Sequence, residues 1–191
     1  RQPRESALGQ NVAERVHQHR EDVDGDNLRR VGQGMDPSWS PDGAQIAFIQ
    51  WQEPRGVWVM DADGGNKRRL TDNGATNWAP SWHPDGKRIV FTSKREGDPD
   101  RNENSDIFVI DADGNTPARK LTSWEGPDHS ASFSPDGSQI AYIQGGSARY
   151  ADYDPGQLAI IPANGGEASL PTRDVDRTIS APRWSADGKS V

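Results

Sequence analysis

One acidic segment carries oxygen-bearing side chains at a spacing that could bind a metal ion. Five of them stand at every second position: Asp98, Asp100, Asn102, Asn104 and Asp106. Carboxylate and amide oxygens at this spacing resemble the calcium ligands of an EF-hand loop. The match is incomplete, because Glu103 replaces the glycine at position 6 and Val109 stands where position 12 requires glutamate. The segment predicts either a calcium site or a solvated acidic loop, and we expect no other cofactor.

Histidine is the other candidate metal ligand, and it is scarce. The chain contains His17, His19, His83 and His129. His17 and His19 stand two residues apart, but no third ligand is evident, and a zinc or manganese site uses at least three protein ligands. The sequence holds neither a Gly-x-Ser-x-Gly nucleophile motif nor a phosphate-binding glycine loop. We therefore expect this chain to be non-catalytic.

The rest of the chain is organised by two recurring motifs. The first reads "PSWSPDG" at 37–43, "PSWHPDG" at 80–86, "ASFSPDG" at 131–137 and "PRWSADG" at 182–188. The second reads "VWVMDADGGNKRRLT" at 57–71, "DIFVIDADGNTPARKLT" at 106–122 and "LAIIPANGGEASLPT" at 158–172, with a weaker copy, "DVDGDNLRR", at 22–30. Self-similarity with a period of about 40–50 residues is typical of repeat architectures.

Each repeat unit predicts four short antiparallel strands, which we call a to d. Strand a ends in an aromatic residue, and Ser-Pro-Asp-Gly then forms a tight turn into strand b. The runs "QIAFIQ", "RIVFTS" and "QIAYIQ" are expected as strand b, and "VWVM", "IFVI" and "LAII" as strand c. Asp-Gly or Asn-Gly then turns into strand d. Four antiparallel strands per unit of this length indicate a propeller blade. The predicted fold is therefore all-β, a partial β-propeller of about three to four blades.

The repeat also sets the expected domain boundaries. We assign 1–34 to an N-terminal segment with the remnant of a preceding blade, then blades at 35–76, 77–127 and 128–177, and the start of a further blade at 178–191. A ring cannot close with this number of blades, so we expect the chain to be a fragment. Open blade edges can pair with other strands, which makes self-association a further expectation.

Chain geometry separates the loops onto two faces. The a–b and c–d turns are short and repetitive, whereas the b–c loops differ in length and sequence between blades, reading "QWQEPRG" at 50–56, "SKREGDPDRNENSD" at 93–106 and "QGGSARYADYDPGQ" at 144–157. Irregular loops on a rigid scaffold usually carry binding. At the same face, residues just before strand a are expected to line the channel mouth and bind a ligand: Asp36, Asn77, Trp78, Asp128 and His129. Ordinary channel lining is the alternative. The nearby Trp51 and Trp124 can equally anchor a peptide or pack a loop.

Composition excludes several classes of function. The net charge of −7 without a lysine-rich tract argues against nucleic acid as a partner. No apolar run is long enough to insert into a membrane. Cysteine is absent, which excludes disulfides and thiol chemistry and fits an extracytoplasmic bacterial protein.

The two motifs together resemble the WD40-like repeat of TolB-type β-propellers over roughly residues 20–191. The same repeat builds TolB, the propellers of prolyl oligopeptidase-type peptidases and oligogalacturonate lyase-like proteins, so the resemblance implies the fold more specifically than the function. The leading expectation is a non-catalytic scaffold that binds a protein or peptide at the b–c and d–a loop face, in the periplasm or outside the cell. The alternatives are the gating propeller of a peptidase and a carbohydrate-binding or lyase-type propeller with a metal in its channel.

Overall fold

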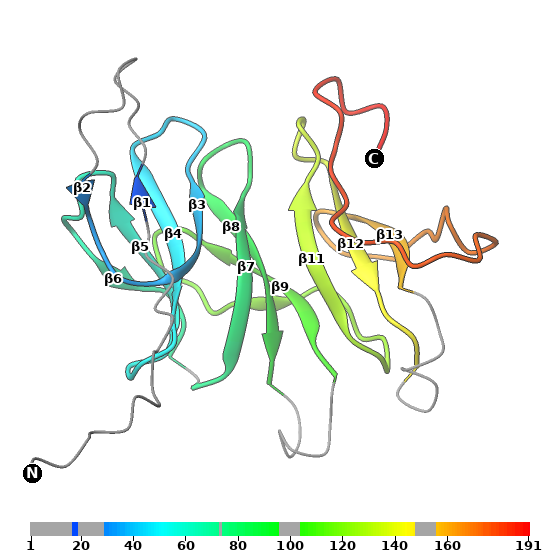
Figure 1. Ribbon diagram of the computed structural model, residues 1–191, viewed down its shortest axis with the longest axis horizontal. Coiled ribbons are helices and arrows are strands. Elements are labelled where there is room, and N and C mark those ends of the chain that lie inside the picture. Colours follow the sequence, from blue (N-terminus) through cyan, green and yellow to red (C-terminus); the bar gives the residue numbers. More distant parts are fainter. Residues whose placement is uncertain (1–16, 19–28, 73, 96–103, 148–155) are drawn as a thin grey trace, which may run out of the picture.

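The computed structural model describes residues 17–18, 29–72, 74–95, 104–147 and 156–191 (Figure 1). These residues form strands and turns and no helix. The prediction of an all-β fold is therefore confirmed, and the sheets follow one another in chain order without closing into a ring (Figure 1).

The first and second blades are four-stranded antiparallel sheets with the predicted a–b–c–d order. The first contains β3 (Met35–Trp39), β4 (Gln45–Gln50), β5 (Gly56–Asp61) and β6 (Arg68–Arg69). The second contains β7 (Thr76–Trp82), β8 (Arg88–Lys94), β9 (Asp106–Asp111) and β10 (Arg119–Lys120). The outermost strands β6 and β10 are two residues long, so the edges they expose offer few free backbone groups.

The other two sheets are smaller. The third contains β11 (Asp128–Phe133), β12 (Gln139–Gln144) and β13 (Gln157–Pro162), and an isolated bridge between Ile160 and Ser169 stands where the other blades have strand d. At the N-terminal side β1 (His17–Gln18) pairs with β2 (Arg29–Arg30). β1 precedes the weaker copy of the second motif at 22–30, and β2 ends it. Strands c and d of a preceding blade would stand at these two places. The assigned blade boundaries remain a prediction.

The turn between β3 and β4 explains why the heptapeptide recurs. Ser40 Oγ donates to Asp42 Oδ1 at 2.6 Å and accepts from the Gln45 amide at 2.9 Å. Gly43 adopts a φ of 68°, which a residue with a side chain reaches only with strain. Hydrogen bonding, first from Ser40, holds the pKa of Asp42 below its ordinary value. The repeated aspartates are therefore turn-forming groups.

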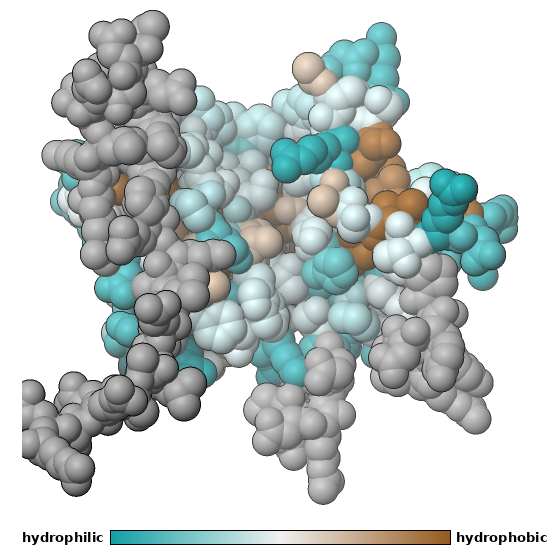
Figure 2. All heavy atoms as spheres, in the orientation of Figure 1, coloured by the Kyte–Doolittle hydropathy of each residue, from teal (hydrophilic) through white to brown (hydrophobic). Residues whose placement is uncertain are grey.

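The hydrophobic core lies between neighbouring blades. At the first joint, Ala47, Ile49, Val57 and Val59 pack against Trp82, Ile89, Phe91, Phe108 and Ile110. At the second, Val90, Ile107 and Val109 pack against Ala131, Phe133, Ile140, Tyr142, Ala159 and Ile161. The second blade thus buries both of its faces against its neighbours, which a single sheet cannot do alone. Hydrophobic atoms still in view gather over β12 and β13 (Figure 2).

Hydrogen bonds also cross between neighbouring blades. Trp82 Nε1 donates to Ser38 O at 3.0 Å, and Trp184 Nε1 donates to Ser132 O at 3.2 Å. Each bond joins the aromatic residue of one strand a to the strand a before it. At the outer edge, the Arg68 guanidinium donates to Ala112 O at 2.8 Å, and Arg119 bonds the corresponding turn of the third blade.

Candidate functional site

The ends of the strands that lead into the irregular loops lie on one face of the molecule. In Figure 1 the Ser-Pro-Asp-Gly turns stand along the upper edge, and the C-terminal ends of β4, β8 and β12 stand along the lower edge. The first strand of each blade, strand a, is its inner strand. These strands, β3, β7 and β11, lie toward the viewer in Figure 1 and together form what we call the inner wall. The two-face arrangement expected from alternating strand direction is therefore present.

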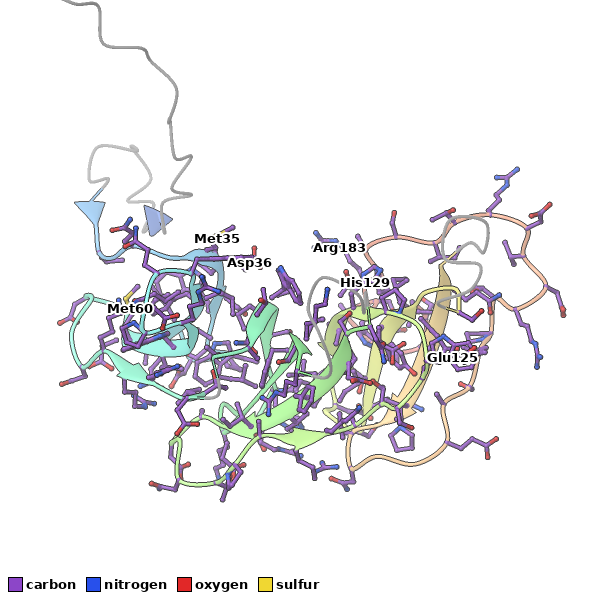
Figure 3. All side chains as sticks on the ribbon, turned by 90° about the horizontal axis from the view of Figure 1, so that it is seen from below. Met35, Asp36, Met60, Glu125, His129 and Arg183 are labelled. Carbon is purple, nitrogen blue, oxygen red and sulfur yellow. The ribbon has the colours of Figure 1, made fainter. Side chains whose placement is uncertain are left out.

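Each inner strand has a bulge near this face. The pairing register shifts between Met35 and Ser38, and the same shift recurs in β7 and β11. The bulges place Asp36, Ala79 and Ser130 at φ values of 48°, 47° and 58°. Positive φ strains a residue that carries a side chain, and such bulges typically re-aim side chains next to binding sites. In Figure 3, Met35, Asp36, His129 and Arg183 all lie on the same side of the ribbon.

A pocket opens at this end, between the first three blades. Its volume is about 510 Å³, and it is lined by Trp51, Thr76, Trp78, Ala79, Thr92, Lys94, Ser105, His129 and Ser130. Trp51 comes from the b–c loop of the first blade, and Trp78 and His129 come from the strand-a positions just before two successive bulges. The pocket therefore combines the b–c loops and the d–a segments.

The pocket walls are aromatic and largely uncharged. Trp51 is 40% exposed. Burial lowers the pKa of His129 below its ordinary value, so the ring is neutral at pH 7, and its Nδ1 lies 2.9 Å from Ser130 Oγ. Lys94 is the one cation among the lining residues. Aromatic rings beside hydrogen-bonding groups suit a ligand with both apolar and polar parts.

Asp128 lies directly behind the pocket. Its amide donates to Ser105 O at 2.7 Å, and Ser105 Oγ donates to the Asp128 carbonyl oxygen at 3.0 Å. Asp128 is 0% exposed, and neither carboxylate oxygen has a hydrogen-bond partner of normal length within the described residues, although Thr122 makes a weaker side-chain hydrogen bond to it. Burial raises the pKa of Asp128 to about 7, with a smaller contribution from the Asp106 carboxylate, while Thr122 and Lys120 act in the opposite direction.

The structure distributes the five predicted channel residues over three environments. Trp78 and His129 line the pocket, and ligand binding by them stays a prediction. Asp36 lies on the inner wall, where its Oδ2 accepts from the Ala79 amide at 2.9 Å. Asn77 and Asp128 do not line the channel mouth: they are 2% and 0% exposed and point into the joints between blades. The expectation that they line the channel mouth is not met, because both lie inside regularly paired strands, where consecutive side chains point to opposite sides.

The candidate calcium ligands lie only partly in the described chain. Asp106 begins β9, where its Oδ2 pairs with Lys120 Nζ at 2.8 Å. Asn104 Nδ2 donates to Trp124 O at 3.1 Å. Asp98, Asp100 and Asn102 fall outside the described residues, so the calcium site and the solvated acidic loop both stay as alternatives. Within the described part of the chain, no three histidines, aspartates or glutamates converge as metal ligands.

Sequence reasoning missed Thr92, Lys94 and Ser105. Thr92 was detectable, because the repeat has isoleucine at the equivalent positions, Ile49 and Ile143. Lys94 and Ser105 flank a loop of irregular length, where repeat alignment carries no information.

Comparison with known proteins agrees with this architecture. The family model described as the TolB beta propeller domain matches residues 20–191. A protein TolB homologue of Chlorobium luteolum is 35% identical over 119 residues, which are 62% of this chain and 24% of that protein.

Two solved structures share the fold. The putative TolB from Agrobacterium tumefaciens aligns with a TM-score of 0.60 at 24% identity, over 75% of this chain and 51% of that one. An oligogalacturonate lyase in complex with manganese aligns with a TM-score of 0.63 at 23% identity, over 88% of this chain and 47% of that one. This chain thus spans about half the length of these structures and a quarter of the Chlorobium relative. Among the described residues, no helix has the length and apolarity to cross a membrane.

Proposed function

This chain belongs to the TolB β-propeller domain family, and we propose that it is a non-catalytic scaffold that binds a protein or peptide at the pocket of its b–c and d–a loop face. One observation carries the proposal. Trp51, Trp78 and His129, which come from three successive blades, converge on one pocket at the face where the loops depart from the repeat. Large, partly exposed aromatic groups are typical anchors of protein interfaces.

The opposite face, which carries the Ser-Pro-Asp-Gly turns, is less suited to binding a ligand. Its turns are closed by their own hydrogen bonds, as Ser40 with Asp42 and Ser134 with Asp136 show. Groups already satisfied by the turn gain little from a ligand, whereas the pocket face holds polar groups without partners within the described residues.

We also propose a periplasmic or extracellular location for the whole protein. The support is the TolB relative together with the absence of cysteine from the chain. We also propose self-association through open blade edges. The edge strands β6 and β10 are two residues long, so they offer few backbone groups for pairing.

The test uses the full-length protein on an array of random-sequence nonapeptides. We expect discrete spots to retain the protein, and Trp51→Ala to weaken their signal about fivefold or more, since a partly buried aromatic anchor contributes on the order of 1–2 kcal/mol. Lys87→Ala, an exposed change on the opposite face, serves as the control. An array with no spots above background, or equal loss in both variants, contradicts the proposal.

A further inference from the structure

The pocket floor contains a hydroxyl group that the repeat does not require. Thr92 stands where the first and third blades have Ile49 and Ile143. It lines the pocket, is 2% exposed, and its Oγ1 has no hydrogen-bond partner within the described residues. A buried polar group without a partner is costly, and isoleucine would avoid that cost. The hydroxyl therefore points to a ligand.

The second buried polar group near the pocket is the carboxyl group of Asp128. Register places Asp128 opposite Gln144, on the side of β11 that faces the second blade, and Thr92 lies on the facing strand β8. Neither Asp128 oxygen has a hydrogen-bond partner of normal length within the described residues, and a weaker hydrogen bond from Thr122 offsets only part of the effect of burial. Thr92 and Asp128 thus lie in one joint. Thr92 Oγ1 can accept from a donor in the pocket, and the Asp128 carboxyl, which does not line the pocket, can contribute a negative charge behind it.

Among the described residues, the charges around Asp128 leave one negative charge without a compensating cation. Lys120 Nζ is bound to Asp106 Oδ2 at 2.8 Å, so those two charges offset each other. The remaining titratable groups near Asp128 are Tyr142, which is neutral because burial and then Asp128 raise its pKa, and His129, which burial keeps neutral. When Asp128 ionises, the joint therefore holds a carboxylate in need of a cation.

The pocket walls suit a cation as well. The indole rings of Trp51 and Trp78 present electron-rich faces, which attract ammonium and guanidinium groups. Lys94 also lines the pocket and opposes a cation there, but it is not free, because it is already engaged within the protein.

Resting on the proposed function, we propose that the pocket recognises a lysine or arginine side chain of the bound peptide. Its cationic group donates to Thr92 Oγ1, packs against Trp51 and Trp78, and has Asp128 as its counter-charge. The opposite specificity, a carboxylate held by Lys94, is the competing outcome.

The experiment uses matched peptide quartets on the full-length protein. Each quartet shares one nonapeptide sequence and places lysine, arginine, glutamate or norleucine at the centre. Norleucine keeps most of the apolar length of lysine without its charge. We expect the lysine or arginine member to bind about tenfold more tightly than the norleucine member in fluorescence anisotropy at pH 8, as suits a charge-assisted hydrogen bond.

Three variants assign that preference to the pocket. Asp128→Asn and Thr92→Ile should each reduce affinity for the lysine member about tenfold and leave the norleucine member within about twofold. Lys94→Gln should strengthen binding of the lysine member, while Lys87→Gln on the opposite face should leave it unchanged.

Each outcome decides between the proposals. Quartets that bind without preference overturn the cation specificity and leave the scaffold function standing. A preference for glutamate that Lys94→Gln abolishes overturns it in favour of carboxylate recognition. A preference for lysine that survives both Asp128→Asn and Thr92→Ile places the cation elsewhere and also overturns the inference. No binding by any peptide overturns the scaffold function together with it.

Discussion

His83 packs edge-to-face against Phe133, with ring centroids 4.6 Å apart and an interplanar angle of 80°. His83 replaces the serine of the Ser-Pro-Asp-Gly turn, and Phe133 replaces the tryptophan that bonds the preceding blade elsewhere. The His83 Nε2 atom lies 3.1 Å from Gly137 O, a carbonyl of the next blade. The Asp85 amide donates to His83 Nδ1 at 3.0 Å, which leaves the proton on Nε2 to donate to Gly137 O, although the Arg88 guanidinium also lies 2.7 Å from Nε2. In that tautomer the imidazole supplies a polar bond across the joint where the indole donor is missing.

We therefore predict that His83→Ser loosens the second joint. The free energy of unfolding should fall by about 1–2 kcal/mol, because a hydrogen bond and an aromatic contact are lost together. The double variant His83→Ser/Phe133→Trp should recover part of this loss, since an indole at 133 can donate to Ser81 O as Trp82 donates to Ser38 O. Urea unfolding of the full-length protein measures both. A double variant less stable than His83→Ser contradicts the substitution of one bond for the other.

Gly137 and Gly43 offer a matched test of the same joint. Both adopt positive φ, 73° and 68°, in equivalent turns. A Cβ on Gly137 would lie 2.2 Å from His83 Nε2, whereas a Cβ on Gly43 meets nothing within 4 Å. Gly43→Ala should cost about 1 kcal/mol for the backbone alone, and Gly137→Ala about 1–3 kcal/mol more for the overpacked joint. Thermal or urea unfolding separates the two, and equal losses would show that the imidazole moves away freely.

Stability should fall as the pH rises, because of Asp128. Its pKa is about 7 in the folded protein and near 4 in the unfolded chain, so the folded state binds the proton more tightly. The penalty of ionising the buried carboxyl begins above about pH 4 and is complete above about pH 7, amounting to roughly 2–4 kcal/mol.

Asp128→Asn should remove most of this dependence. The variant should match the wild type near pH 4 and exceed its stability at pH 8, in urea unfolding of the full-length protein at both pH values. If the difference in unfolding free energy between the wild type and Asp128→Asn is the same at pH 8 as at pH 5, the carboxyl group already has a partner in the folded protein.

Calcium at millimolar concentration should not raise the thermal midpoint above that with magnesium. Asp106, the last residue of the candidate loop, is already paired with Lys120 and lies in β9. A calcium-specific rise that Asn104→Ala abolishes would instead support the loop at 98–106 as a site.

The repeated motifs predicted the blades because each motif forms its turn through contacts among residues that are close in the sequence. Ser40, Asp42 and Gly43 close a turn whatever the rest of the chain does, and the alternation of buried and turn residues then defines strands b and c. The same reasoning located Trp78 and His129, since position along strand a decides which face a residue approaches.

The sequence placed the candidate channel residues before strand a, so it did not predict the side of the strand that each one faces. Asn77 and Asp128 precede Trp78 and His129 by one residue, yet they are buried in the joints while their neighbours line the pocket. Both pairs stand before the register shift, so ordinary alternation along the strand separates them. Pairing across the sheet extends strand a to include these residues, and no single motif records that pairing.

By itself, the sequence determined the all-β repeat, its turns and the face on which loops vary, because turn chemistry and strand alternation depend on neighbours along the chain. The tertiary structure alone decided that Thr92 and Asp128 share a joint, that His83 completes another blade's contact, and that Asp106 is held by Lys120. Those relationships depend on how blades pack against one another, and packing joins residues that stand tens of positions apart.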